Sequence, residues 1–332
     1  ISNALKARGR DDCAATLALA VLRRPDCTGR AHAMARPIVA GDVPKWHWPM
    51  IRDSARNAAY DDALRRAVGP GSHVLDIGAG SGLLAMMSAR AGAERVVACE
   101  MVPAVAAVAQ EIIRHNGFDQ RIRVVPKHSR DVAVGIDLDR PADVIVSEIV
   151  DNSLLGEGVL PTHADAVRRL LRPGGRVIPA AGSILVALGF APKLAARRMA
   201  THQGFDLSPF NVLDKPFLRA HVGRDEVRFL SDDASLFRFA FGEPDQWPGA
   251  DAEVTVTARA GTANAVVQWI RLDMDDSGGP GAAIDSRPGV DRHSTWASVL
   301  WPLREPVTWR GGETVRIAGR RTDTTVTIWL EG

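Results

Sequence analysis

The chain of 332 residues has few cysteines and almost no excess of charge of either sign. Its three cysteines, Cys13, Cys27 and Cys99, are odd in number and scattered, which excludes a disulfide scaffold and a cysteine-rich zinc site. This usage, and an N-terminus without a charged stretch followed by an apolar core, predicts a reducing, cytoplasmic location. The 41 Lys and Arg exceed the 39 Asp and Glu by only two, which argues against a nucleic-acid partner.

Long apolar runs and paired metal ligands are also missing. No run approaches the roughly 18–20 residues of a membrane span, so the sequence predicts no membrane partner. The nine histidines show no paired ligand spacing, so no metal is expected. What remains is the composition of a globular protein, with 46% hydrophobic and 24% charged residues. A chain of this length is expected to form about two domains.

The sequence patterns divide the chain into three parts. Residues 1–36 are expected to form a helical segment whose apolar stretch, 15–22, resembles the second half of a tetratricopeptide repeat. A lone amphipathic helix is the alternative. Residues 37–178 begin with a loop over 37–44 and then alternate strands and helices, which predicts a doubly wound, Rossmann-like parallel sheet of the α/β class. The strands are expected at 72–77, 95–100, 122–126 and 143–147, and the helices at 83–91, 103–116 and 164–171.

Residues 179–332 have a different texture. Alternating, β-branched segments at 253–258, 265–272 and 324–330 predict a mostly antiparallel barrel or sandwich. Residues 192–222 interrupt this pattern with helix-like character, so we expect an inserted helical arm there. The Gly- and Pro-rich stretch 277–289 is expected to be a loop.

A glycine-rich turn follows the strand at 72–77. Glycines let the backbone approach a ligand where a Cβ atom would clash. The spacing over residues 78–82 is G-x-G-x-G, whereas the dinucleotide loop has G-x-G-x-x-G, which argues against NAD. The turn resembles the S-adenosylmethionine (SAM) loop of class I methyltransferases. Asp76, Gly78 and Gly80 are therefore candidate cofactor-binding residues, although a plain tight turn is the alternative.

Glu100 ends the next expected strand, 20 residues after Gly80. A carboxylate at this place can accept hydrogen bonds from both hydroxyls of a ribose. A solvated acid at a strand end is the alternative for Glu100 alone. The glycine turn and Glu100 together predict a nucleoside ligand.

Two glutamates follow the strand at 143–147. Glu148 comes directly after the strand, at the edge where doubly wound sheets bind ligands. A loop then brings Glu157, flanked by Gly156 and Gly158. Two converging acids are tolerable beside a cationic ligand, and the planar guanidinium with its five donors fits best. In the alternative the acids are unrelated, one capping a helix and the other solvated.

These residues resemble the protein arginine methyltransferases. The resemblance covers residues 43–190 and extends more weakly to the C-terminus. It rests on S-E-x-x-D-x-x-L-x-G-E-G, which is similar to the double-glutamate loop of that family. The resemblance implies that Glu148 and Glu157 are catalytic and clamp the guanidinium of a protein or peptide arginine. It also implies that SAM is the methyl donor.

The same resemblance assigns further residues. The segment 46–57 is similar to the helix that covers SAM, which implies that His47 and Arg56 hold its methionine carboxylate and that Met50 lies beside the methyl group. Ser129 would contact the adenine. Trp296 would lie in the wall of the active site and bind substrate. By the same likeness, residues 192–222 correspond to an arm that would form a homodimer.

Some positions depart from the family pattern. Thr295 precedes Trp296 where the family has a histidine, and Tyr60 is the single tyrosine, so the paired tyrosines ahead of the covering helix are missing. The branch with N-terminal tetratricopeptide repeats is the most similar. Two alternatives remain open: a class I methyltransferase acting on a small guanidino or amine metabolite, and a weakly active SAM-binding scaffold.

Overall fold

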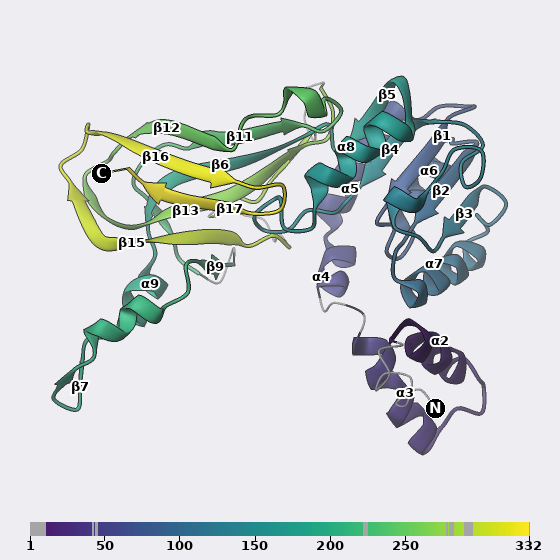
Figure 1. Cartoon of the computed structure of the whole chain (residues 1–332), viewed down its shortest axis with the longest axis horizontal. Helices are drawn as coiled ribbons and strands as arrows, with labels where there is room; N and C mark the ends of the chain where they lie inside the picture. Colours follow the sequence, from purple (N-terminus) through teal and green to yellow (C-terminus); the bar gives the residue numbers. More distant parts are fainter. Residues whose placement is uncertain are drawn as a thin grey trace. The chain divides into compact units, whose positions relative to one another are not determined.

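The computed structural model describes residues 11–41, 43, 46–221, 225–276, 278, 282–288 and 295–331 (Figure 1). The chain divides into two compact units. The first comprises Ile1–Glu148 and Asp165–Ile178, and the second comprises Ile149–Ala164 and Pro179–Gly332. The first ten residues of the expected N-terminal helical segment lie outside the described residues. Within the described ranges, no helix is both long and apolar enough to cross a membrane.

The described part of the first unit contains a five-stranded sheet in which every neighbouring pair is parallel. The order is β3-β2-β1-β4-β5, the arrangement of a doubly wound sheet, as the sequence predicts. Buried β-branched and aliphatic side chains fill β1, β2 and β4, which explains their strand conformation. The strands are β1 His73–Ile77, β2 Arg95–Cys99, β3 Ile122–Val125, β4 Ala142–Ser147 and β5 Leu171–Ile178.

Helices connect these strands close to the predicted positions. Pro103 starts α7 in the first helical turn, where its missing N–H costs nothing, and Gly117 follows the end of the helix with φ +76°. One prediction is corrected: the last helix begins five residues earlier than expected, because Pro161 is tolerated in its first turn. The helices are α6 Leu83–Arg90, α7 Pro103–His115 and α8 Val159–Arg169, with the 3-10 helix η1 at Ser129–Asp131.

The described residues 11–41 form two helices, where the sequence indicates one followed by a loop. Helix α2, Asp11–Leu22, packs against α3, Gly29–Gly41, through a small apolar cluster that includes Ala14, Ala18 and Ile38. The predicted loop over 37–44 is therefore wrong for its first five residues. Pro37 lies inside α3, and the packing of the neighbouring Ile38 offsets the hydrogen bond that proline cannot donate.

The segment expected to cover SAM is broken into two helices. Helix α4, His47–Arg52, ends at Asp53, and α5, Ser54–Ala67, begins directly after it. The side chain of Asp53 accepts a hydrogen bond from the backbone N–H of Arg56 at 2.9 Å and so caps α5. The cap fixes the start of α5 and with it the position of Arg56.

The described part of the second unit is antiparallel, in agreement with the predicted sandwich or barrel. Its larger sheet has the order β10-β6-β13-β15-β9, with β11 paired to β6 and β14 to β13, and a smaller sheet has the order β12-β16-β17. Trp269, Phe237, Phe239 and Phe241 are fully buried in this unit. The strands are β6 Ala181–Phe190, β9 Leu218–Ala220, β10 Arg228–Phe229, β11 Ala234–Ala240, β12 Asp251–Thr257, β13 Gly261–Asp273, β14 Ala283–Asp285, β15 Ser298–Trp309, β16 Thr314–Arg321 and β17 Val326–Leu330.

The predicted arm leaves the end of β6 and projects from this unit's sheets (Figure 1). It consists of α9 Pro192–Arg197, the short strands β7 Thr201–His202 and β8 Phe205–Asp206, and the 3-10 helix η2 Ser208–Leu213. The chain returns to the larger sheet through β9. The stretch 277–289, expected to be a loop, contains β14, because Ile284 is buried and pairs with Leu272 of β13. A further 3-10 helix, η3, spans Pro244–Gln246.

Candidate active site

The candidate site of the first unit lies at the carboxyl ends of its parallel strands. Gly78 follows β1, Glu100 follows β2 and Glu148 follows β4, while Ser129 comes after β3. The order of the strands reverses at β1: β2 and β3 lie on one side of it and β4 and β5 on the other, and ligands bind at such a switch point. The fold thus gathers residues from four separate stretches of sequence at one edge.

The glycine turn has the backbone that the sequence predicts. Gly78, Gly80 and Gly82 have φ values of +73°, +54° and +79°, in the left-handed region that favours glycine. A Cβ atom on Gly82 would lie 2.9 Å from Ile113, so this glycine lets α6 and α7 approach closely. A Cβ atom on Gly80 would meet nothing nearer than 3.9 Å, and His47 is one of its two neighbours. Gly80 therefore lies beside the ring of His47, at the distance of an ordinary van der Waals contact.

Glu100 holds the glycine turn in place. Its Oε2 accepts a hydrogen bond from the backbone N–H of Gly80 at 3.0 Å, and its Oε1 accepts one from the N–H of Val102 at 2.8 Å. The side chain is buried, and each carboxylate oxygen keeps a second lone pair for a ligand hydroxyl. The predicted cofactor residues Gly80 and Glu100 are thus in direct contact.

Two buried polar groups beside this turn lack a hydrogen-bond partner within the described part of the chain. They are both carboxylate oxygens of Asp76 and the hydroxyl of Ser129. Burial raises the pKa of Asp76 to about 7; the nearby backbone N–H of Ala85 opposes this shift, and the charge of Glu100 adds to it. Buried polar groups normally have partners, so these atoms fit a polar ligand such as SAM.

Helix α4 carries the residues expected to cover the cofactor. The ring of His47 stacks on that of Trp46, with centroids 4.1 Å apart and planes 11° from parallel. Met50 is half-buried one turn further along the helix. Trp46, directly before α4, and Trp48, within it, are 46% and 53% exposed, so both indole side chains are partly open to solvent.

The first glutamate of the pair is bound to an arginine. Oε2 of Glu148 accepts a hydrogen bond from Nη1 of Arg56 at 2.9 Å, and the two side chains are only 6% and 3% exposed. The sequence analysis assigns Arg56 to the cofactor and Glu148 to the substrate, and it does not predict that the two meet. The structure shows that this carboxylate holds a guanidinium.

The surroundings of this ion pair set the charge of Glu148. Burial raises the pKa of Glu148 to about 7, although the nearby Arg56 lowers it and Asp53 raises it further. Tyr60, which sequence reasoning left without a role, is fully buried and donates a hydrogen bond to the carbonyl oxygen of Ser147 at 3.0 Å. It thereby anchors the residue before Glu148. Asp53 is a residue type favoured as a helix cap, and this signal could have located the start of α5.

The second glutamate, Glu157, belongs to the second unit. It is exposed in the loop between β4 and α8. Trp296 is buried, and its indole N–H donates to the carbonyl oxygen of Val150 at 3.0 Å, at the start of this loop. Trp296 was assigned to substrate binding, and its observed contact is with the loop backbone.

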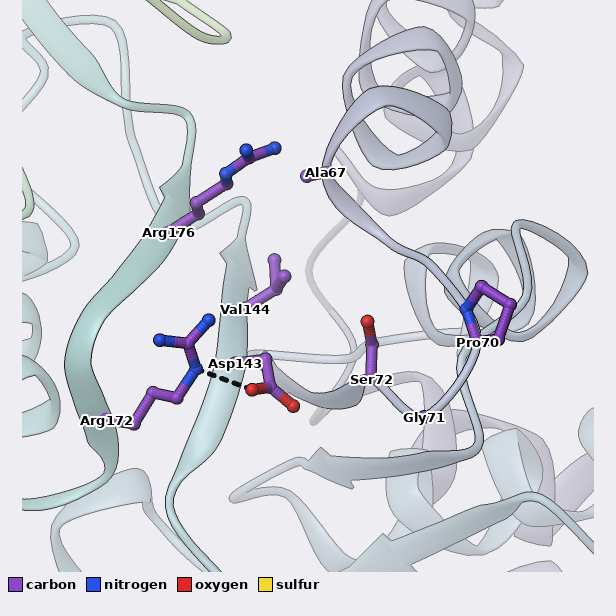
Figure 2. Close-up of a pocket in the computed structure, with 8 residues that line it drawn as sticks. All are labelled: Ala67, Pro70, Gly71, Ser72, Asp143, Val144, Arg172 and Arg176. Atoms are coloured by element: carbon purple, nitrogen blue, oxygen red, sulfur yellow. Dashed lines mark hydrogen bonds and ion pairs between the residues drawn. The ribbon is translucent and has the colours of Figure 1, made fainter.

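A separate hollow of about 230 Å³ opens at the amino ends of β1 and β4 (Figure 2). Arg172 and Arg176 of β5 point into it, and Nε of Arg172 donates to Oδ1 of Asp143 at 2.6 Å. Asp143 also accepts hydrogen bonds from Arg140 and from the backbone N–H of His73. None of the predicted site residues lines this hollow. The ion pair of Arg172 with Asp143 connects the edge strand β5 to β4. Among the described residues, no cluster of side chains could hold a metal ion.

Comparison with known proteins places this geometry in a family. The chain is 38% identical over 283 residues to the arginine N(omega)-methyltransferase of Streptomyces achromogenes subsp. streptozoticus, which covers 84% of this chain and 77% of that protein. The chain belongs to the arginine methyltransferase family. It is also 38% identical over 252 residues to protein arginine N-methyltransferase 7 of Oryza sativa subsp. indica. That match covers 69% of the chain but about a third, 35%, of the rice protein.

Other comparisons agree with this family. The model for ribosomal protein L11 methyltransferase (PrmA) matches residues 62–185. The structure is similar, with a TM-score of 0.73 and 25% identity over 83% of this chain and 87% of the other, to the Trypanosoma brucei PRMT1 enzyme-prozyme heterotetrameric complex with AdoHcy. Arabidopsis thaliana protein arginine methyltransferase 10 shares the fold, with a TM-score of 0.66 and 18% identity over 83% of this chain and 88% of the other. The predicted family, fold class and cofactor are confirmed. The predicted relationship to the tetratricopeptide-repeat branch stays a prediction.

Proposed function

We propose that the chain transfers a methyl group from SAM to a guanidino nitrogen of arginine. The buried carboxylate of Glu148, which binds the guanidinium of Arg56, carries the proposal. That ion pair uses Oε2, so Oε1 remains for the guanidinium of a substrate. Membership of the arginine methyltransferase family supports the same reaction.

The cofactor would be held by residues of the first unit. Asp76, Glu100 and Ser129 offer buried polar groups at the carboxyl edge of the sheet, beside the turn that contains Gly80. Arg56 would bind the carboxylate of SAM through the guanidinium donors, chiefly those of Nη2, that Glu148 and Asn57 leave available. When bound, SAM supplies an electrophilic methyl group.

The two glutamates would act on the substrate guanidinium. Its pKa exceeds about 12, so the substrate arrives as a cation. Glu148 and Glu157 would fix one nitrogen toward the methyl donor and draw the positive charge to the other nitrogens. Orientation of this kind supplies about 7–11 kcal/mol in favourable cases. Glu148, with its pKa near 7, is suited to accept the proton that the nitrogen loses.

Arginine in a protein or peptide is the substrate that we propose first, because the matched relatives include protein arginine N-methyltransferase 7 from rice. Free arginine or another small guanidino compound is the second candidate. It is favoured by the Streptomyces relative, whose name lacks the word protein and which this chain matches over 77% of its length. The single tyrosine, which leaves the pair of the family pattern incomplete, favours it too. A weakly active SAM-binding scaffold is the remaining alternative.

Labelled SAM and two matched substrate pairs test the proposal. One pair is an Arg/Gly-rich peptide and the same peptide with lysine for arginine, and the other is free arginine and citrulline. We expect label in the arginine peptide, in free arginine or in both, and none in the lysine peptide or citrulline. Bound SAM without transfer to either guanidino substrate would contradict the proposal and support the scaffold.

We also propose how the chain is organised and located. Residues 37–178 would form the SAM-binding domain and residues 179–332 the substrate domain. The three cysteines are few and scattered along the sequence, which suits a cytoplasmic location. The arm would pair with a second copy of the chain, because it exposes large apolar side chains, among them Phe205 at 71% and Val212 at 85%.

A further inference from the structure

The loop that carries Glu157 is shaped by a single carboxylate, that of Asp151. Its Oδ1 accepts three hydrogen bonds: from the backbone N–H of Ser153 at 3.0 Å, from the hydroxyl of Ser153 at 2.7 Å and from the backbone N–H of Gly156 at 2.9 Å. Gly156 is the residue before Glu157. The three hydrogen bonds close residues 151–156 into a compact turn, and Glu157 is the first residue after it.

The first half of the loop is fixed to the core of the second unit. The indole of Trp296 donates to Val150, and the backbone N–H of Ala297 donates to the side-chain oxygen of Asn152 at 2.6 Å. The side chain of Leu154 is fully buried, although its φ of +77° is unusual for a leucine. A backbone held in this region persists where its surroundings determine it, and such residues cluster at functional sites.

Asp151 connects this anchored half to the exposed half that carries Glu157. Gly156 and Glu157 are exposed, whereas Leu154 and Leu155 are fully buried. Asp151 packs directly against Gly156, because a Cβ atom on Gly156 would lie only 2.6 Å from Cγ of Asp151. A glycine is therefore required at position 156 if Asp151 is to reach the N–H group of that residue.

We infer that Asp151 is a positioning residue, which holds Glu157 in place for the substrate guanidinium through the acceptor capacity of Oδ1 and not through its negative charge. The inference rests on the proposed function of Glu157 in the clamp. The inference predicts different effects for two substitutions of Asp151. An asparagine keeps the side-chain oxygen as an acceptor, whereas an alanine removes it.

The test compares Asp151→Ala and Asp151→Asn by amide hydrogen exchange and by steady-state methylation. In Asp151→Ala, exchange at Ser153 and Gly156 should accelerate about tenfold, because a protecting hydrogen bond is lost. Its kcat should fall about 100-fold, the cost of misplacing a reacting group by an ångström, with SAM affinity unchanged. Asp151→Asn should stay within about threefold of the wild type, since neutral acceptors form weaker bonds than charged ones.

Gly156→Ala gives an independent variant, in which the new methyl group displaces the Asp151 side chain. It should lower kcat as much as Asp151→Ala, and the double variant should be no slower than either, because both changes break the same contact. Glu313→Ala is the matched control. Glu313 accepts backbone hydrogen bonds from Arg310 and Gly311 in the turn between β15 and β16, so exchange should rise there without a change in kcat.

Two results would overturn the inference. In one, Asp151→Asn is as slow as Asp151→Ala, which would mean that the charge acts on the substrate. In the other, Asp151→Ala exchanges or turns over like the wild type. If the wild-type protein methylates no arginine compound, the proposed function fails, while the exchange measurement alone still decides whether Asp151 holds the loop.

Discussion

At the residue scale, Glu148 combines burial, a raised pKa and a bound guanidinium. The substitution Glu148→Gln keeps a side-chain oxygen as an acceptor for Arg56 and removes the negative charge that a substrate cation needs. We expect turnover to fall at least about 100-fold, the usual cost of one lost electrostatic contact in an active site, while SAM still binds. Glu111→Gln is a control, since Glu111 is an exposed glutamate of α7 that forms an ion pair with Arg23. Near-normal turnover of Glu148→Gln would refute the clamp.

The raised pKa of Glu148 has a consequence for stability. Folded Glu148 has a pKa of about 7, above its ordinary value of 4.5, so the folded protein binds its proton more tightly than the unfolded chain. The contribution of Glu148 to the free energy of unfolding should therefore fall as pH rises from about 4.5 to 7. Urea unfolding of the ligand-free wild type and Glu148→Gln across this range measures it. The wild type should lose stability relative to the variant, and a constant difference would show that Glu148 does not titrate there.

Sequence reasoning at this scale found residues but not their pairings. Glu148 and Glu100 were predictable because each directly follows a buried strand. The contact between Arg56 and Glu148 was not, since 92 positions separate them and only the folded α5 and β4 bring them together. The sequence motif contains Asp151 but does not predict its role, because that role depends on a backbone turn that the spacing of the motif residues does not reveal.

At the scale of the element, two glycines of the turn are expected to have different roles: Gly80 in cofactor binding and Gly82 in the packing of α6 on α7. Gly80→Ala places a methyl group in ordinary contact with the ring of His47, whereas Gly82→Ala pushes one against Ile113. Both should lose about 1–2 kcal/mol of stability from the left-handed backbone. Gly80→Ala should also weaken SAM binding about tenfold through overpacking of the ligand space. Urea unfolding and SAM titration check the pair, and equal SAM affinities for the two variants would contradict this assignment.

The predicted elements of the parallel sheet agree with the structure to within a few residues, because the alternation of buried strands and helices is local information. The errors occurred where tertiary packing overrides composition. Helix α3 continues through Pro37 because its apolar side packs on α2, and β14 forms in a Gly- and Pro-rich stretch because Ile284 is buried beside β13. The break between α4 and α5 depends on the cap at Asp53.

At the scale of the whole molecule, the exposed apolar arm predicts self-association. Replacing Phe205 and Leu213, each 71% exposed, by serine should convert a dimer into a monomer in light scattering. Ile136→Ser is a control of equal exposure, 71%, on a loop of the first unit, and it should leave the mass unchanged. A wild-type protein that is monomeric at all concentrations would show that the arm has another role.

The central claim, that this chain methylates a guanidino nitrogen, is tested most directly by mass spectrometry of substrates after incubation with labelled SAM. We predict one or more methyl groups on the guanidino group of arginine, in the Arg/Gly-rich peptide or in the free amino acid, and almost none with Glu148→Gln. Fragment ions that place the label on any other atom, or equal labelling by the wild type and Glu148→Gln, would contradict the account.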